Sequence, residues 1–354
     1  MSLTQVAPGM MNSTAQYYSY KNRIINGAMT INQRNATATT NGGFPVDRFS
    51  IGNNSGATYT GTQDTNAPAG FANSLKITIT GTATPTGSNQ FALYQGLEGY
   101  NTYDLLFGTA NAKTVTLSFW VNCSLTGTFG GALQNYAQSR SYPFSYTITS
   151  ANTWQQVVVT IPGDTGGTWV GASNAGSMEL CFGLSVGPTY SGPAGAWAGT
   201  TYLTVTGATN FTGTSGATFY LTGVQLEVGS SATAFDYRDY RNELALCQRY
   251  YELIPGLAGG YIIFVGQAIS GSDVQSGGIF KVSKRAAPSI SAYGTINANG
   301  YNNGGAGAVT ITSSSAGTET WAIRWTGASG LTAGYASGIY PGNASSGIAF
   351  SSEL

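Results

Sequence analysis

One stretch of this sequence changes from a strand pattern to a helix pattern, and it separates two regions that are both rich in strand patterns. In Phe219–Val228 apolar and polar residues alternate with one slip near Gly223, which predicts a half-buried strand with a bulge at the glycine. In Asp239–Glu252 the apolar residues recur at helical spacing instead. The residues that share or flank this helical face are Leu244, Cys247, Tyr250 and Tyr251.

The helical stretch has signals at both ends. Asp239 or Asn242 can cap its start, and Pro255 followed by Gly256 cannot continue it. We therefore predict a short junction helix over residues 239–255. Its apolar face is expected to be buried between the flanking domains or at a contact between subunits, which makes these four residues a predicted junction or oligomerisation surface.

The region before the helix predicts one large β domain. Short alternating segments are separated by turns rich in glycine and proline, such as Thr126–Gly131, with no helical pattern between them. These segments are Asn73–Thr80, Lys113–Val121, Trp154–Ile161, Ser177–Val186, Tyr202–Val205 and Phe219–Val228. The patterns predict a jelly roll or β-sandwich over residues 22–238, in a chain of the all-β class.

Strand patterns restart after Pro255 and predict a smaller C-terminal β-sandwich over residues 256–354. Its segments are Tyr261–Val265, Gly278–Val282, Ser289–Tyr293, Ala308–Thr312, Glu319–Trp325 and Gly347–Leu354. At the other end of the chain, residues 1–21 contain few core-forming side chains. They are predicted to form an N-terminal arm that is ordered only against a partner.

The charge content argues against several classes of function. Only 8% of the 354 residues are charged, with 14 basic and 14 acidic side chains and no run of like charge. A nucleic-acid or anionic-membrane partner would need a basic patch, and no apolar run approaches the length of a membrane span. We therefore expect no nucleic-acid binding and no membrane insertion. The N-terminus also lacks the basic and apolar regions of a signal peptide.

The residue types also limit the chemistry. Without histidine, Ser-His-Asp and Cys-His catalysis and His-based zinc sites are impossible. Asp164 begins the triplet Asp-Thr-Gly of aspartic proteases, but those enzymes need two aspartates, and the surrounding residues favour a turn. Carboxylate pairs that could act on a glycosidic bond are Glu98 with Asp104 and Asp236 with Asp239. Local ion pairs explain the second pair better, so we predict no catalytic residues.

No cofactor and no metal site are predicted either. Phosphate-binding and calcium-binding motifs are absent from the sequence, although calcium near Asp64, Asp104 or Asp273 stays open because it needs only oxygen ligands. The three cysteines are odd in number and widely spaced, which favours buried free thiols over disulfides. They are Cys123, Cys181 and Cys247.

Aromatic side chains in polar turns are the candidate binding residues. Aromatic faces pack against sugar rings, while Asn, Ser and backbone groups supply hydrogen bonds. The candidates are Trp169 and Trp197 in the first domain and Tyr293, Tyr301, Tyr335 and Tyr340 in the second. Each could instead anchor its loop to the core or to a subunit contact. That alternative is favoured for Trp169 and Trp197, whereas both interpretations fit Tyr301 and Tyr335 equally.

Several segments together match a known pattern. They are Asn22–Arg34, Asp47-Arg48-Phe49, Gln95–Gly99, Val115–Asn122, Trp154 with Ile161–Trp169, and Phe219–Tyr251, within which YLTGVQLEVGSSATAF followed by ELALCQRYY is quite specific. Over residues 22–251 the chain resembles the tail-fibre and virion-appendage proteins of tailed bacteriophages whose main domain is a carbohydrate-binding-module-like jelly roll. The resemblance implies a virion structural protein that forms a homotrimer, is attached to other virion proteins through residues 1–21, and presents a variable C-terminal domain outward.

Together, the resemblance and the aromatic candidates predict a tail fibre or receptor-binding protein on the surface of the phage particle. It would attach to host cell-surface polysaccharide without catalysis, through the C-terminal domain. The alternative is a purely structural protein, either a head decoration or an adaptor whose distal domain binds another virion protein. Residues 256–354 carry no motif that decides between the two, because fold alone does not fix function.

Overall fold

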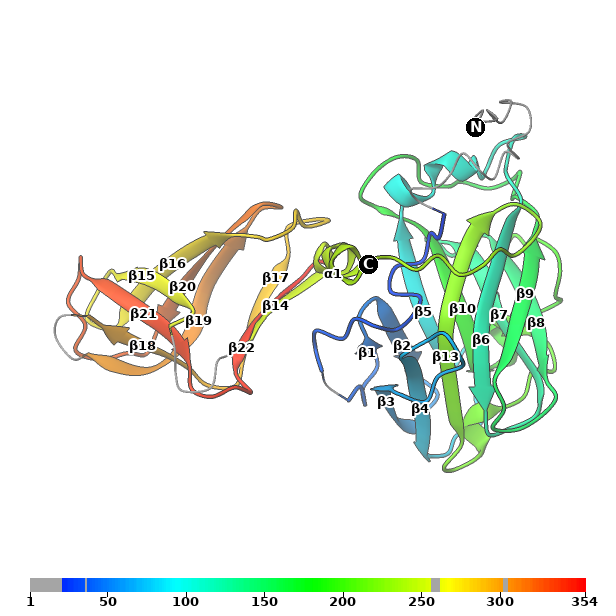
Figure 1. Ribbon diagram of the computed structural model, residues 1–354, viewed down its shortest axis with the longest axis horizontal. Helices are drawn as coiled ribbons and strands as arrows, with labels where there is room; N and C mark the ends of the chain where they lie inside the picture. The colour runs from blue at the N-terminus through cyan, green and yellow to red at the C-terminus, as the bar shows by residue number, and fades with distance from the viewer. Residues whose placement is uncertain (1–20, 36, 256–261, 302–304) are drawn as a thin grey trace, which may run out of the picture. The chain divides into compact units, whose positions relative to one another are not determined.

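The computed structural model describes residues 21–35, 37–255, 262–301 and 305–354 (Figure 1). The chain forms two compact units, one that extends up to Glu243 and includes Leu354, and one formed by Leu244–Glu353. Strands dominate both units, and the one α-helix among the described residues is α1, Tyr240–Gln248. The prediction of an all-β chain with a single short helix is therefore confirmed.

The larger unit is a β-sandwich of two antiparallel sheets. The six-stranded sheet has the order β1 (Gly43–Val46), β2 (Phe49–Asn53), β5 (Gln90–Glu98), β10 (Gly176–Val186), β7 (Gly127–Asn135) and β8 (Ser141–Ile148). The five-stranded sheet has the order β3 (Thr58–Asp64), β4 (Ser74–Gly81), β13 (Thr218–Val228), β6 (Val115–Cys123) and β9 (Gln155–Ile161). Alternate residues of both sheets meet in one core, in which Phe91, Phe119 and Phe182 are fully buried.

Strand β13 shows how the sequence pattern positions these sheets. Leu221, Val224 and Leu226 are fully buried in the core. Gly223 interrupts the alternation: its φ is 62°, and the pairing of β13 with β6 shifts register between Thr222 and Gln225. The bulge predicted at this glycine is therefore confirmed, and it lets apolar residues on both sides of the slip reach the same core.

A long excursion after β10 covers part of the outer face of the six-stranded sheet. It contains two short paired strands, β11 (Ser191–Gly192) and β12 (Thr204–Val205). Leu203 from this excursion packs with Ala92 and Cys181, which point outward from β5 and β10. The chain thereby fills part of that face with its own side chains.

The smaller unit differs from the sandwich that the sequence predicts. Six strands close into a barrel in the order β15 (Phe264–Ala268), β16 (Asp273–Ile279), β20 (Thr320–Thr326), β19 (Ala306–Ala316), β18 (Ile296–Gly300) and β21 (Ala336–Pro341). A separate three-stranded sheet contains β14 (Tyr251–Pro255), β22 (Gly347–Ser351) and β17 (Ser289–Tyr293). The barrel closes because β21 pairs with both β15 and β18, which leaves no open edge in that sheet.

The junction helix is shorter than the predicted span 239–255. It begins after Asp239, whose carboxylate accepts a 3.0 Å hydrogen bond from the amide of Arg241 as a helix cap. It ends at Gln248, whose carbonyl accepts a 2.5 Å hydrogen bond from the ammonium of Lys284. Tyr251–Pro255 is the strand β14, fully paired with β22. That long-range pairing overrides the local helical spacing on which the prediction was based.

Other predictions concern single residues and the chain terminus. The three cysteines are buried free thiols, as predicted. The predicted arm, residues 1–21, lies outside the described residues except for Lys21, which donates a 2.6 Å hydrogen bond to the carbonyl of Ala234. Within the described parts of the chain, none of the helices has the length and apolar character that a membrane crossing requires.

Candidate functional site

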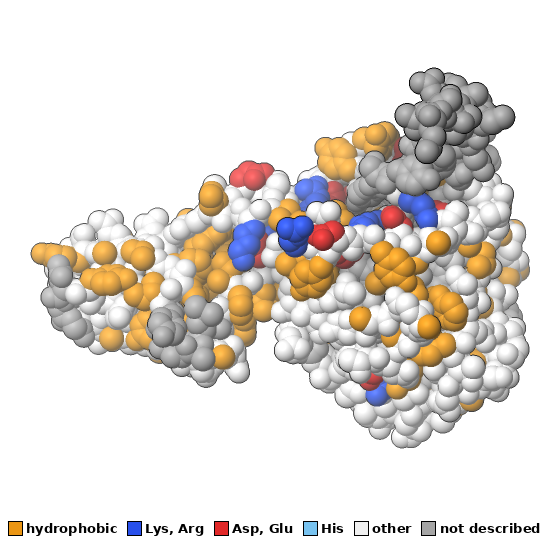
Figure 2. Space-filling view, in the orientation of Figure 1, with side chains coloured by type: hydrophobic (Ala, Val, Ile, Leu, Met, Phe, Trp, Pro, Cys, Tyr) orange, Lys and Arg blue, Asp and Glu red, His pale blue; other side chains and the backbone are white. Residues whose placement is uncertain are grey.

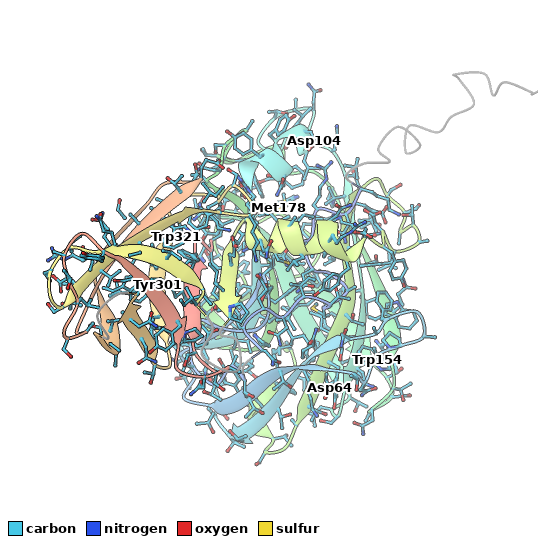
Figure 3. The ribbon with its side chains drawn as sticks, turned by 60° about the vertical axis from the view of Figure 1, so that its left-hand side comes forward. Asp64, Asp104, Trp154, Met178, Tyr301 and Trp321 are labelled. Carbon is cyan, nitrogen blue, oxygen red and sulfur yellow. The ribbon has the colours of Figure 1, made fainter. Side chains whose placement is uncertain are left out.

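Two of the candidate tyrosines, Tyr301 and Tyr335, lie on adjacent backbone segments at one end of the barrel. Tyr301, labelled in Figure 3, follows β18. Its amide donates a 3.3 Å hydrogen bond to the carbonyl of Ala336, the residue after Tyr335. The carbonyl of Tyr335 accepts a hydrogen bond from Ala268 at the end of β15. Tyr301 is 56% exposed and Tyr335 is 48% exposed. The barrel thus presents two solvent-facing tyrosines from neighbouring strand ends.

The other two candidate tyrosines of this unit lie elsewhere. Tyr340 is on β21 opposite Asn297, and five residues of extended strand place it about 16 Å along the chain from Tyr335. Tyr293 ends β17 in the three-stranded sheet, opposite Gly347, and burial raises the pKa of its hydroxyl. The backbones of Tyr301 and Tyr335 therefore lie on adjacent segments, and the structure does not gather all four tyrosines into one site.

Trp169 and Trp197 form part of an aromatic cluster against the core of the larger unit. Their ring centroids are 5.6 Å apart with perpendicular planes, and both rings contact Phe107 edge to face. The indole of Trp197 donates a 2.7 Å hydrogen bond to the carbonyl of Pro162, and that of Trp169 donates to Asp164. Both polar edges are thus already satisfied within the protein, which is the arrangement expected of loop anchors.

The carboxylates weighed as catalytic or metal-binding candidates are held by cations or amides. Asp164 accepts two hydrogen bonds from Arg140, at 2.8 and 2.5 Å, and one from the amide of Gly166, as expected in a turn. Burial raises the pKa of Asp164, but the hydrogen bonds from Arg140, Gly166 and Trp169 outweigh it and lower the pKa overall. The ion pairs of the calcium candidates are Asp64 with Lys76, Asp104 with Arg23, and Asp273 with Arg324.

The remaining glycosidase candidates are also committed to local structure. Glu98 is fully buried at the end of β5. Asp236 accepts a 3.2 Å hydrogen bond from the amide of Asn22, and Asp239 pairs with Arg241. Among the described residues, no three acidic, cysteine or histidine side chains gather in a way that could hold a metal ion.

One polar group that sequence reasoning missed lies on the outer face of the six-stranded sheet. Glu179 on β10 accepts a 2.6 Å hydrogen bond from the buried amide of Gln134 on β7, its cross-strand neighbour. Burial raises the pKa of Glu179, although the hydrogen bonds of Gln134 and Gln138 oppose this shift. Its signal in the sequence was a single glutamate within an alternating segment, which is too common a pattern to mark a site.

The predicted junction residues differ in burial. Cys247 and Tyr250 are fully buried, whereas Leu244 and Tyr251 are partly buried. Tyr251 belongs to β14 and pairs with Ser351, so it does not lie on the helix. Helix α1 therefore contributes Leu244 and Cys247 to this set, and the following turn contributes Tyr250.

No family model matches the chain, and no curated protein matches its sequence. Among solved structures, the larger part of the chain is similar to the enzymatically active domain of tailspike protein 4 of bacteriophage CBA120, with 13% identity and a TM-score of 0.34 over 59% of this chain. That match covers 22% of the tailspike chain.

Two carbohydrate-binding modules are similar at the same level. A CBM4 protein shows 19% identity and a TM-score of 0.32, over 58% of this chain and 98% of its own. A family 11 module of a cellulosomal cellulase from Clostridium thermocellum shows 12% identity and a TM-score of 0.29, over 56% and 97%. Similarities this low carry no functional weight, so the function has to follow from the side chains of this chain.

Proposed function

We propose that this protein is a non-catalytic, glycan-binding tail fibre or receptor-binding protein on the surface of a tailed-bacteriophage particle. The observation that carries this proposal is the pair of exposed tyrosines, Tyr301 and Tyr335, at one end of the barrel. The phage assignment rests on the resemblance of residues 22–251 described above.

The surroundings of the tyrosine pair suit a neutral, hydroxyl-rich ligand. The exposed side chain of Gln267 lies beside Tyr335, where its amide donates a 3.3 Å hydrogen bond to the carbonyl of Gly334. The amide oxygen of Gln267 can therefore accept a hydrogen bond from a hydroxyl group. Tyrosine rings add contact area at a low cost in conformational entropy, which is why adaptable binding surfaces use them.

A site of two tyrosines binds a single sugar weakly, so repetition matters. In the homotrimer that the resemblance implies, three copies of the site would engage one surface, and avidity could exceed the affinity of a single site by about 10²–10⁴-fold. Residues 1–21 would attach the trimer to other virion proteins. The barrel would then meet host cell-surface polysaccharide.

The test is binding of the full-length protein to purified lipopolysaccharide and capsular polysaccharide from a panel of bacteria, measured by biolayer interferometry. The variant is Tyr301→Ala with Tyr335→Ala. Tyr103→Ala is the matched control, because Tyr103 is 54% exposed but lies in the larger unit. We expect the double variant to lose binding and the control to retain it, with the oligomeric mass unchanged in both.

Two results would contradict the proposal. If the double variant binds as the wild type does, the tyrosine pair is not the site. If the wild type binds no polysaccharide and the double variant instead fails to enter phage particles, the structural alternative of a decoration or adaptor protein is correct.

A further inference from the structure

Strand β9 (Gln155–Ile161) forms one edge of the five-stranded sheet, and among the described strands only β6 pairs with it. The pairing continues without a register shift from Gln155, opposite Val121, to Ile161, opposite Val115. The strand contains no proline and no charged side chain. An uninterrupted, uncharged edge of this kind is a template on which another strand can pair.

The register shows which backbone groups of β9 point away from the sheet. The amide of Ser124, which follows β6, donates a 2.9 Å hydrogen bond to the carbonyl of Thr218 on β13. Hydrogen-bonding direction alternates along a strand, so the even-numbered residues of β6 bond to β13 and the odd-numbered ones to β9. Odd-numbered residues of β6 stand opposite odd-numbered residues of β9. The amides and carbonyls that remain, and that no described residue binds, belong to Gln156, Val158 and Thr160.

The other three edges of the sandwich are covered or interrupted. On β3, Gly61 exchanges two backbone hydrogen bonds with Ala38, at 2.7 and 2.8 Å. Strand β1 has four residues, includes Pro45 and pairs with a register shift. Strand β8 includes Pro143 and is bridged by a loop at its first residue. Because β9 has none of these devices, its open edge calls for a separate explanation.

The side chains of β9 make this edge complementary to itself. Val158 is 51% exposed, and Gln156 and Thr160 on either side of it are also exposed. In an antiparallel pair of two β9 strands centred on Val158, this residue meets its own copy, and the amide of Gln156 meets the hydroxyl of Thr160. No like charges meet, because the strand is uncharged. Figure 2 shows uncharged side chains over the part of the larger unit where Figure 1 places β9.

We propose that β9 is an interface between two copies of this chain, which pair their β9 edges antiparallel about a two-fold axis at Val158. The pair gives partners to the open amides and carbonyls of both edges and joins the two five-stranded sheets into one. A two-fold contact uses the same surface on both copies, which a self-complementary edge provides. One strand edge is a small interface, so the contact is weak and depends on concentration.

This interface is independent of the tyrosine pair and of the proposed trimer. If the trimer also forms, the contact between β9 strands joins two trimers. The first test is light scattering after size exclusion, over a dilution series of the full-length protein. The wild-type mass should approach that of two chains of 36.6 kDa as the concentration rises, or that of six chains if the trimer forms.

The variants place charge on the edge. Val158→Lys should raise the dissociation constant of the contact by about tenfold, because it replaces an apolar pair with two like charges directly opposite each other. Val158→Thr keeps a β-branched side chain and should associate as the wild type does. Thr60→Lys is the matched control, because partly exposed Thr60 lies on β3 at the opposite edge of the same sheet. Thermal unfolding checks that each variant is folded.

Crosslinking tests the register. Val158→Cys is treated with a short bis-maleimide, to which the three native thiols are inaccessible because they are buried. The two Cα atoms at position 158 are about 5.5 Å apart in the proposed pair, so a covalent dimer should form. A mixture of Gln156→Cys and Thr160→Cys should crosslink better than either variant alone, because like positions then lie about 13 Å apart along the strands. Thr60→Cys should give no covalent dimer.

Three results overturn the proposal. One is a wild-type mass of one or three chains at every concentration; the edge would then belong to another virion protein, and Val158→Lys would be lost from phage particles. Another is Val158→Lys with the wild-type mass throughout the series, or Thr60→Lys with an equal decrease in mass. The last is Val158→Cys without a covalent dimer, or a mixture of the 156 and 160 variants that crosslinks no better than each alone.

Discussion

The ion pair between Lys284 and Glu252 predicts a large loss of stability in the smaller unit when either partner is removed. The ammonium of Lys284 lies 2.6 Å from Glu252 and 2.5 Å from the carbonyl of Gln248, where α1 ends. The side chains of Lys284 and Glu252 are 0% and 2% exposed. Burial lowers the pKa of Lys284, and the hydrogen bond that its ammonium donates to the carboxylate of Glu252 only partly offsets this shift, so burial disfavours the charged form of Lys284.

The size of the effect follows from what each substitution leaves behind. Glu252→Gln leaves a buried ammonium without its counter-charge, and Lys284→Met leaves a buried carboxylate, each a loss of about 3–5 kcal/mol. The double variant Lys284→Met with Glu252→Leu removes both charges. It still leaves the Gln248 carbonyl without its donor, at about 1–3 kcal/mol. We therefore expect the double variant to be more stable than either single variant by about 2 kcal/mol.

The measurement is hydrogen–deuterium exchange in increasing urea, followed by mass spectrometry on peptides from β14 and β22. These strands belong to the smaller unit, so the free energy of unfolding is obtained for that unit alone. The reasoning fails if both single variants remain within about 1 kcal/mol of the wild type, or if the double variant is no more stable than the single ones.

Three further predictions follow from other sites. Hydrogen bonds from Arg324 and Thr326 lower the pKa of Asp273 to about 2, below the unfolded value of about 3.9. The melting temperature should therefore fall as the pH drops from about 4 through 2. Asp273→Asn should make the melting temperature depend less on pH in this range, and an equal pH dependence in the variant and the wild type would refute the prediction. Gly223→Ala should cost about 1–2 kcal/mol in thermal unfolding because φ is positive and the new methyl meets Phe71 and Trp120; an unchanged melting temperature would contradict this. Leu244→Asp should lower the oligomeric mass measured by light scattering if α1 lies at a subunit contact, and a soluble oligomer of unchanged mass would remove that role.

The strands that the sequence predicted well are those with clean alternation and one buried face. Asn73–Thr80 and Trp154–Ile161 match β4 and β9 closely, because the alternation within each segment predicts which side chains are buried and which are exposed. The end of the junction helix was wrong for the opposite reason. Its position depends on Lys284 and on pairing with β22, both far away in the chain.

The candidate site residues also differ in whether their own segment of sequence is enough to identify them. Tyr301 and Tyr335 could be selected from sequence because each is a single aromatic among Gly, Asn, Ser and Thr, although their proximity could not. The proximity of Phe71 and Tyr237, and that of Trp154 and Tyr220, could not be predicted, because these aromatic side chains come from separate loops and a strand that only the folded sheet brings together. A polar or aromatic cluster assembled by strand register has no signature within any one segment.

Glycine is the residue type for which this limit is most visible. Thr126–Gly131 was interpreted as a turn, but Gly127–Asn135 is strand β7, and a Cβ atom at Gly131 would lie 2.3 Å from the carbonyl oxygen of Cys181 and 2.5 Å from the ring of Phe144. The glycine is there because a neighbouring strand and an aromatic ring occupy the space of a side chain. Gly223 has the same role beside Phe71 and Trp120. In a chain with 50 glycines, several apparent turn signals therefore mark positions where an aromatic side chain packs against a strand.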